Sequence, residues 1–236
     1  MVAKKITSLQ HSLVKHWVQL REKRTYREET QRVLVSGEKM IKELSVEVLI
    51  SSEPIPKVKA KEYFIVSEEI LKKITGISCK CAAEIVLPPP QDLRSKKNIV
   101  ILDQIADPGN LGTLLRTMLA LGWEGVIVTP GTVDLFNDKA LRAAKGATFH
   151  LPYAQMTIEE ISQLKMSFFT ADIDGIPLSS LSFSSPLALI LSHEGRGAGD
   201  WSKKLSKKVT IPMNTKVESL NVATSGAILL YEMRPK

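Results

Sequence analysis

Three segments of this 236-residue sequence place polar side chains directly after apolar runs that are typical of buried strands. Those side chains are Asn110 and Arg116 in segment 101–123, Glu194 in segment 187–199, and Ser219 and Asn221 in segment 209–232. A carboxylate beside flexible backbone can accept hydrogen bonds from a ligand or orient an arginine. The second segment supplies such backbone, because it carries Gly195, Gly197 and Gly199.

Each of these residues, taken singly, also has a purely structural explanation. Asn110, Ser219 and Asn221 could cap helices, since Asn and Ser are favoured at helix starts. Arg116 could form a surface ion pair, and Glu194 could brace its own loop. Taken together, however, three strand ends deliver polar groups and turn backbone to one edge of one sheet, as a single binding site requires.

The elements that position these groups alternate between strand and helix from residue 98 to the end. Strands are expected at 98–103, 125–130, 167–171, 187–191 and 209–212, with helices between them. This alternation predicts an α/β fold with a parallel sheet covered by helices on both faces. On the helix that begins near residue 111, five apolar side chains share one stripe and Arg116 lies outside it. The stripe consists of Leu111, Leu114, Leu115, Met118 and Leu119.

The first part of the chain predicts a separate, smaller α/β domain. It contains a short helix at 38–44, strands at 46–50 and 63–66, and a helix that Ser67 caps and Gly76 ends. The following stretch LPPPQDLRSKKN, at 87–98, has three prolines and a run of charges, which indicates a linker. We therefore expect a first domain at 1–90, a linker at 91–97 and a second domain at 98–236.

The charge of the chain favours a polyanionic partner. Lys and Arg number 32 against 25 Asp and Glu, and residues 1–32 alone hold eight basic and three acidic side chains, or +5 of the total +7. This region predicts one long basic helix, which is either solvated or in contact with phosphates. The candidate RNA contacts are Lys15, Arg21, Lys23, Arg24 and Arg27.

Several classes of protein are excluded or disfavoured by composition and pattern. No apolar run approaches the roughly 20 residues of a membrane-spanning helix, and the N-terminus does not read as a secretory signal, so a cytoplasmic protein is expected. Cys79 and Cys81 lack a His or Cys cluster, so no metal site is predicted. The GNLG at 109–112 lacks the third glycine of a dinucleotide fingerprint, which argues against a dehydrogenase.

In their order and separations, the three segments closely resemble the motifs of the SpoU family of RNA 2'-O-ribose methyltransferases, also called the TrmH family, of the SPOUT superfamily. Asn110 and Arg116 match its N-x5-R motif, 192–197 matches its N/G-x-E-G-x-G loop, and 211–213 with 219–221 match its IPM and SLN signature. Ser192 departs from the usual glycine and Ala223 from a common serine. The first domain, with ITSLQHSLVKHW and LVSGEKMIKEL, looks like the L30e-like substrate-binding domain of rRNA-modifying members.

The resemblance implies a C-terminal trefoil knot, bent S-adenosylmethionine bound within it, and a homodimer. By position, it implies that the cofactor pocket is lined by Ser192, Gly195, Ile211, Met213 and Leu220. It likewise implies that the transfer site is surrounded by Asn110, Arg116, Glu194, Ser219 and Asn221. The expected partner is RNA, not DNA or a membrane, and large-subunit rRNA is favoured because tRNA-modifying members generally lack the first domain.

For the chemistry, the resemblance points to Arg116 as the residue that assists loss of the hydroxyl proton. A guanidinium is a poor base, with a pKa above about 12. We therefore expect Arg116 to bind the phosphate beside the ribose and orient the hydroxyl, with Glu194 as the alternative base. Two other functions stay open: a tRNA 2'-O-methyltransferase, and a non-catalytic RNA-binding protein that retains the fold.

Overall fold

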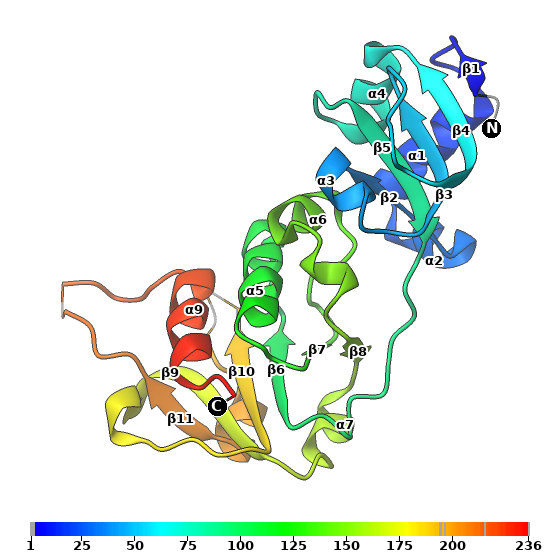
Figure 1. The fold of residues 1–236 in the computed structure, drawn as a ribbon. Coiled ribbons are helices and arrows are strands. Elements are labelled where there is room, and N and C mark those ends of the chain that lie inside the picture. The colour runs from blue at the N-terminus through cyan, green and yellow to red at the C-terminus, as the bar shows by residue number, and fades with distance from the viewer. Residues whose placement is uncertain (1–2, 194, 196, 215, 236) are drawn as a thin grey trace. The chain divides into compact units, whose positions relative to one another are not determined.

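The computed structural model describes residues 3–193, 195, 197–214 and 216–235, and Figure 1 shows their fold. The chain divides into two compact units. The first comprises the chain up to Pro89 together with Phe136–Arg142, and the second comprises Pro90–Leu135 and the chain from Ala143 onward. Within the described residues, no helix has the length and apolar character to cross a bilayer.

The first unit is built on a five-stranded sheet of order β1-β4-β3-β5-β2. Its strands are β1 (Lys4–Ile6), β2 (Arg32–Ser36), β3 (Val46–Ser51), β4 (Ala60–Val66) and β5 (Cys81–Val86). Its helices are α1 (Ser12–Glu22), α2 (Arg24–Thr30), α3 (Glu38–Ile41) and α4 (Glu68–Thr75). β1, β4 and β3 pair in parallel, whereas β5 pairs antiparallel with both β3 and β2.

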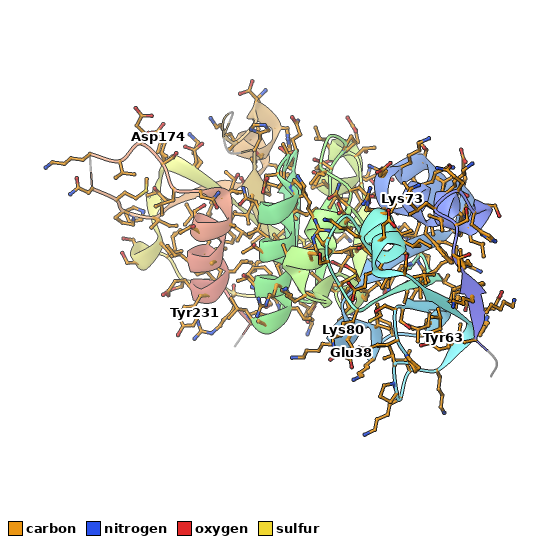
Figure 2. The ribbon with its side chains drawn as sticks, turned by 90° about the horizontal axis from the view of Figure 1, so that it is seen from above. Glu38, Tyr63, Lys73, Lys80, Asp174 and Tyr231 are labelled. Carbon is orange, nitrogen blue, oxygen red and sulfur yellow. The ribbon has the colours of Figure 1, made fainter. Side chains whose placement is uncertain are left out.

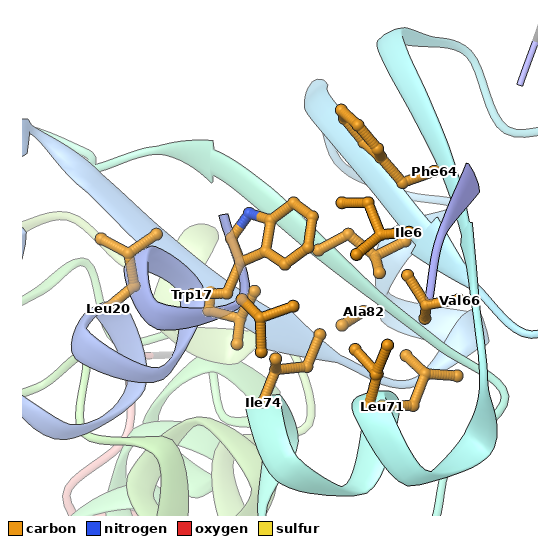
Figure 3. Packing of buried hydrophobic residues seen from close by; sticks show 12 residues of the cluster. Ile6, Trp17, Leu20, Phe64, Val66, Leu71, Ile74 and Ala82 are labelled. Carbon is orange, nitrogen blue, oxygen red and sulfur yellow. The ribbon is translucent and has the colours of Figure 1, made fainter. Parts of the chain in front are cut away.

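Helices α1 and α4 bury the apolar core of this unit against its sheet (Figure 3). Trp17 and Leu20 of α1, and Leu71 and Ile74 of α4, are fully buried at helical spacing. The predicted ends of α4 are confirmed. The side chain of Ser67 accepts a hydrogen bond from the backbone N–H of Ile70, and Gly76 adopts the left-handed conformation at φ 72°.

The basic N-terminal region forms two helices, so the prediction of one long helix is wrong. α1 ends at Glu22 and α2 begins at Arg24, with Lys23 between them in an extended conformation at φ −114° and ψ 116°. The helical pattern of apolar residues ends at Leu20, and no glycine or proline marks the break.

The second unit is built on a six-stranded sheet of order β11-β9-β10-β6-β7-β8, in which every neighbouring pair is parallel. Its strands are β6 (Asn98–Asp103), β7 (Gly125–Val128), β8 (Tyr153–Gln155), β9 (Ser167–Pro177), β10 (Leu187–Ser192) and β11 (Lys207–Thr210). Its helices include α5 (Pro108–Ala120), α7 (Ile158–Ser162), α8 (Asp200–Leu205) and α9 (Val222–Glu232). Helix α6 (Asp138–Ala144) spans a boundary between units, and short 3-10 turns follow at Ala147–Phe149 and Leu178–Ser180.

The predicted fold class is confirmed, because helices cover both faces of this parallel sheet (Figure 1). Alternate residues of β10 point to opposite faces. Ala188 and Ile190 share a core cluster with residues of α7 and α8, whereas Leu191 faces α9. Helices α5 and α9 lie side by side on this second face, and a Cβ at Gly226 would come within 2.5 Å of Leu114. The trefoil knot stays a prediction.

Residues 91–97, for which a linker is expected, pack on the second unit. Leu93 is fully buried in the core cluster of that unit, and the backbone N–H of Gln91 donates to the carbonyl of Tyr153 at 2.8 Å. Asp92, Arg94 and Lys97, on either side of Leu93, stay exposed. A single apolar residue within a charged run was too weak a sequence signal to indicate this packing.

Candidate active site

The carboxyl ends of β6 and β10 bring two of the three sequence motifs together. The two strands are neighbours in the sheet, and Ser192 at the end of β10 is the register partner of Asp103 at the end of β6. The chain leaves β6 toward α5 and leaves β10 through the glycine-bearing loop at 193–199. Both loops therefore begin at the same edge of the sheet, where ligands bind in open α/β folds.

A pocket of about 410 Å³ lies at this edge, between the end of β10, the segment after β11 and the start of α9. It gathers all five residues for which cofactor contacts are expected, and also the Ser219 of the expected transfer site. These residues are Ser192, Gly195, Ile211, Met213, Leu220 and Ser219. Apolar side chains of Leu191, Val209 and Leu229 complete much of its wall.

The hydroxyl oxygen of Ser192 has an uncommon environment in this pocket. It is buried, and it has no hydrogen-bond partner among the described residues. Buried hydroxyl groups are normally hydrogen-bonded, and an unsatisfied one costs free energy. A ligand in the pocket that offers a donor or acceptor to this oxygen would remove that cost.

A hydrogen bond between Asn110 and Asn221 joins α5, in the first motif, to α9, in the third motif. The side-chain amide of Asn221 donates to Oδ1 of Asn110 at 3.1 Å. Asn221 also caps α9, because its Oδ1 accepts from the backbone N–H of Ala223 at 2.8 Å. Asn110, by contrast, is not the cap that its position allowed. Asp107 caps α5 by accepting from the backbone N–H of Asn110 at 2.7 Å.

Arg116 lies on α5 outside its buried stripe, as the helical periodicity predicts. It is exposed, and it does not line the pocket. No hydrogen bond or ion pair joins it to another residue in the part of the chain that the structure describes. Leu119, which the same periodicity places on the buried stripe, is instead 37% exposed. Glu194 lies outside the described residues.

The candidate RNA contacts of the first unit separate into two groups. Lys15 and Lys23 are exposed, and Arg24 is an exposed residue whose Nε donates to Glu28 at 2.7 Å. Arg21 is half-buried and donates to the carbonyl of Lys73 at 3.2 Å.

The burial of Arg27 contradicts its prediction as an RNA contact. It is only 3% exposed, and its guanidinium donates to the carbonyl oxygens of Leu20 at 2.7 Å and Arg21 at 3.0 Å. These are C-terminal carbonyls of α1, which an arginine satisfies well. Arg27 therefore joins α2 to α1 and is not retained as a candidate RNA contact.

Sequence reasoning missed a charged pair in the pocket wall. Nζ of Lys203 on α8 lies 3.4 Å from Oδ2 of Asp172 on β9, and both residues line the pocket. The register between β9 and β11 shifts, so that Val209 pairs with Ile176 while Lys208 pairs with Thr170. Residues 171–175 thus bulge from the ladder and carry Asp172 into the wall. Asp-x-Asp-Gly is a common turn pattern, so the sequence offered no specific signal.

No group of three or more His, Cys, Asp or Glu side chains suited to a metal ion occurs among the residues described. In the loop at 193–199, His193 forms hydrogen bonds with Gly195 and Gly197. Nδ1 of His193 accepts from the backbone N–H of Gly195 at 2.9 Å, and its carbonyl accepts from that of Gly197 at 2.9 Å.

Comparison with known proteins places this site in a family. The model of the SpoU rRNA Methylase family matches residues 97–231, which cover all three motifs. The 23S rRNA (guanosine(2553)-2'-O)-methyltransferase RlmP of Bacillus subtilis is 36% identical over 152 residues, which are 62% of this chain and 61% of that protein. The 23S rRNA (adenosine(1067)-2'-O)-methyltransferase of Streptomyces azureus is 35% identical over 150 residues, 60% of this chain and 56% of that protein.

A crystal structure of AdoMet-bound rRNA methyltransferase from Sinorhizobium meliloti shares the fold of both units. It superposes with a TM-score of 0.86 over 98% of this chain and 97% of that one, at 24% identity. The sequence matches span less than two thirds of the curated relatives' own length. The family model, however, covers more than half of this chain. The chain therefore belongs to the SpoU rRNA Methylase family.

Proposed function

We propose that this protein transfers the methyl group of S-adenosylmethionine to the 2'-hydroxyl of a ribose in large-subunit ribosomal RNA. The observation that carries the proposal is the pocket at the carboxyl ends of the strands, which gathers every residue expected to contact the cofactor. The two relatives are both named as 23S rRNA 2'-O-methyltransferases, which supports the same reaction.

The residues of the pocket suit this cofactor. A volume of about 410 Å³ lies within the range of about 300–1,000 Å³ that is usual for small-molecule sites. Leu191, Val209 and Leu229 offer apolar surface for a nucleoside ring. The unpartnered Ser192 hydroxyl and the backbone at Gly195 offer polar groups to the cofactor's own donors and acceptors.

When bound, S-adenosylmethionine supplies a methyl group on a positively charged sulfur, open to in-line attack by a hydroxyl oxygen. The chain supplies alignment, which is a large part of the acceleration in a displacement of this kind. The Asn110–Asn221 pair holds the N-termini of α5 and α9 beside each other. Helix N-termini attract anionic groups, so this pair favours a phosphate of the RNA backbone.

Arg116 is our candidate for orienting the ribose. Its exposed guanidinium can bind the flanking phosphate through two parallel hydrogen bonds. The proton that the hydroxyl loses then passes to that phosphate or leaves through Arg116. Glu194 is the alternative proton acceptor. Asn110, Ser219 and Asn221 complete the polar surroundings of the transfer site.

We further propose that the first unit binds the RNA substrate. Lys15 and Lys23 present exposed positive charge on its first helices. A separate basic unit suits a folded RNA that is recognised by shape and phosphate positions. The shared fold of the whole chain with an rRNA methyltransferase supports rRNA over tRNA as the substrate.

A homodimer is the assembly we propose for the second unit. Leu119 on α5, with Ile228 and Tyr231 on the neighbouring α9, are large apolar residues that remain exposed. Figure 2 shows Tyr231 beside one end of α9, in the last turn of the helix. A second copy that packed on these two helices would remove this apolar surface from water.

The reaction is tested by methyl transfer from radiolabelled S-adenosylmethionine to purified large-subunit rRNA and, in parallel, to bulk tRNA. We expect label in rRNA from the wild-type protein and none from Arg116→Ala. Label in tRNA alone would replace the substrate class but keep the reaction. Binding of rRNA without binding of the cofactor would instead support a non-catalytic RNA-binding protein.

A further inference from the structure

Asp103, the last residue of β6, carries a buried carboxylate whose two oxygens are both hydrogen-bonded. The residue is 4% exposed. Its Oδ1 accepts from the Thr129 hydroxyl at 2.7 Å, and its Oδ2 accepts from the indole N–H of Trp201 at 3.2 Å. Thr129 follows β7, whereas Trp201 is the second residue of α8. The carboxylate therefore joins the middle of the sheet to a helix far along the chain.

Both ends of the glycine-bearing loop at 193–199 are connected to Asp103, one directly and the other through Trp201. At the start of the loop, Ser192 pairs with Asp103 in the parallel ladder between β10 and β6. At its end, Gly199 caps α8 and lies against Trp201, because a Cβ at Gly199 would come within 3.2 Å of the indole ring. Asp103 thus holds one end through strand pairing and the other through its carboxylate.

The loop between these ends forms part of the pocket wall. Gly195 and Gly197 line the pocket, and Gly197 adopts the left-handed conformation at φ 66°. Glycine-rich backbone loses more conformational entropy than other backbone when a ligand orders it. A loop that is fixed at both ends has already lost part of that freedom, so ligand binding costs less.

We propose that Asp103 is a positioning residue for the cofactor: its carboxylate, through Trp201, holds residues 197–199 at the end of the glycine-bearing loop in the position that binds S-adenosylmethionine. This inference rests on the proposed function. Asp103 does not line the pocket and contacts no part of the transfer site that the structure shows. Its contribution belongs to cofactor binding, not to the displacement itself.

The test compares Asp103→Asn and Trp201→Phe with the wild-type protein. Asparagine keeps the size of the side chain but removes its negative charge and replaces one acceptor oxygen with a donor, so the bond to Trp201 is no longer charge-assisted. Phenylalanine keeps one aromatic ring but removes the indole N–H together with the second ring of the indole. For both variants we expect the Kd for S-adenosylmethionine in calorimetry to rise about tenfold, which is the loss of one charge-assisted hydrogen bond.

Kinetics distinguish positioning from general loss of stability. We expect the KM for S-adenosylmethionine to rise in both variants, while kcat at saturating cofactor stays within about twofold of wild type, because saturation restores the loop. Hydrogen exchange of a peptide spanning 193–199 should become faster in the free variants and return to the wild-type rate with cofactor bound.

Trp17→Phe is the matched control. The indole N–H of Trp17 donates to the buried carboxylate of Glu84 at 3.1 Å. The substitution therefore removes the same kind of hydrogen bond from the first unit, which does not form the cofactor pocket. We expect it to lower stability without changing the Kd for the cofactor. If Asp103→Asn fails to fold, Trp201→Phe alone carries the test.

Two results would overturn the inference in distinguishable ways. A wild-type protein that does not bind S-adenosylmethionine would refute the proposed function, and the inference with it. A wild-type protein that binds, with Trp201→Phe and every folded Asp103→Asn sample binding equally well, would refute only the role of Asp103.

Discussion

Ser192 departs from the glycine that the family motif implies at this position. Its side chain adds a buried hydroxyl without a hydrogen-bond partner among the described residues. We predict that Ser192→Ala raises the Kd for S-adenosylmethionine about tenfold, because the cofactor loses a hydrogen-bond partner. The same change should leave the thermal stability of the free protein equal or slightly higher, since an unsatisfied group is removed. Calorimetry and thermal unfolding measure the two effects.

Ser51→Ala is the control for this prediction. The hydroxyl of Ser51 is buried but bonded to the carbonyl of Glu53 at 2.6 Å and the hydroxyl of Tyr63 at 2.7 Å. Its removal should lower the free energy of unfolding by about 1 kcal/mol and leave cofactor binding unchanged. A Ser192→Ala protein that is destabilised as much as Ser51→Ala, with unchanged Kd, would show that the hydroxyl has no role in binding.

Substitution of Arg116 tests the methyl-transfer step rather than cofactor binding. Because it does not line the pocket, we predict that Arg116→Lys leaves the Kd for S-adenosylmethionine unchanged but lowers kcat about a hundredfold. A lysine keeps the charge and loses the planar pair of donors that fits a phosphate. Single-turnover methylation of rRNA measures the effect, and turnover near the wild-type rate would contradict a role that depends on the guanidinium.

The residues that sequence patterns placed well are those whose neighbours in the chain determine their environment. The apolar stripe of α5 leaves Arg116 outside it, and Ser67 forms the expected cap of α4. The prediction of Arg27 as an RNA contact was wrong because its guanidinium binds carbonyl groups of another helix, α1. The cap of α5, for which Asn110 was one candidate, is Asp107, which precedes the proline at the start of the helix.

At the scale of elements, the buried carboxylate of Glu84 ties β5 to α1. It accepts from Trp17 at 3.1 Å and from His16 at 3.2 Å. Burial alone would raise the pKa of Glu84, but the hydrogen bond and charge of His16, with further contributions from Trp17 and Arg32, outweigh burial and lower it. The ionised form is therefore favoured in the folded first unit.

This lowered pKa predicts acid sensitivity of the first unit. The stability that ionised Glu84 contributes is fully present above the unfolded pKa of about 4.3 and is lost as the pH falls through the lower folded value. We expect Glu84→Gln to be less stable at pH 7 by about 1–3 kcal/mol and to show a shallower loss below pH 4. Denaturant unfolding followed by Trp fluorescence measures both, and identical acid slopes would contradict this account.

Strands and helices were predictable where the pattern of apolar residues within the segment determines them. They were less predictable where an element depends on pairing with a strand far along the chain. The strands at 98–103 and 187–192 read directly from their apolar runs. β9, by contrast, extends to Pro177, well past the expected end at Ala171, because its last residues pair with β11 after the bulge. The helix expected near Ser219 begins at Val222, where Asn221 provides the cap.

At the scale of the whole molecule, the exposed apolar face of α5 and α9 predicts a dimer. We expect the wild-type protein to have twice the 26.1 kDa mass of one chain in light scattering, and Ile228→Glu to be a monomer. Ile158→Glu is the control, because Ile158 on α7 is 39% exposed against 38% for Ile228. A monomeric wild-type protein, or equal effects of both substitutions, would contradict the proposed interface.

Composition and charge indicated a globular protein with a polyanionic partner, and alternation indicated the parallel sheet. The connectivity of the strands could not be predicted in the same way, because the path of the chain through its own loops leaves no periodic signal in the sequence. The knot came only from the resemblance of Asn110, Arg116 and the loop at 192–197 to a family, and it stays a prediction. The same limit applies to the substrate nucleotide.

The central claim is that methylation occurs on ribose oxygen, and the most direct measurement is nucleoside analysis of the product. Large-subunit rRNA is incubated with the protein and S-adenosylmethionine, digested to nucleosides and analysed by mass spectrometry, with an unincubated sample as reference. We predict one additional 2'-O-methylnucleoside, which alkaline hydrolysis confirms because the methylated ribose resists cleavage. A base-methylated nucleoside, or no new nucleoside from rRNA although the cofactor binds, would contradict the account.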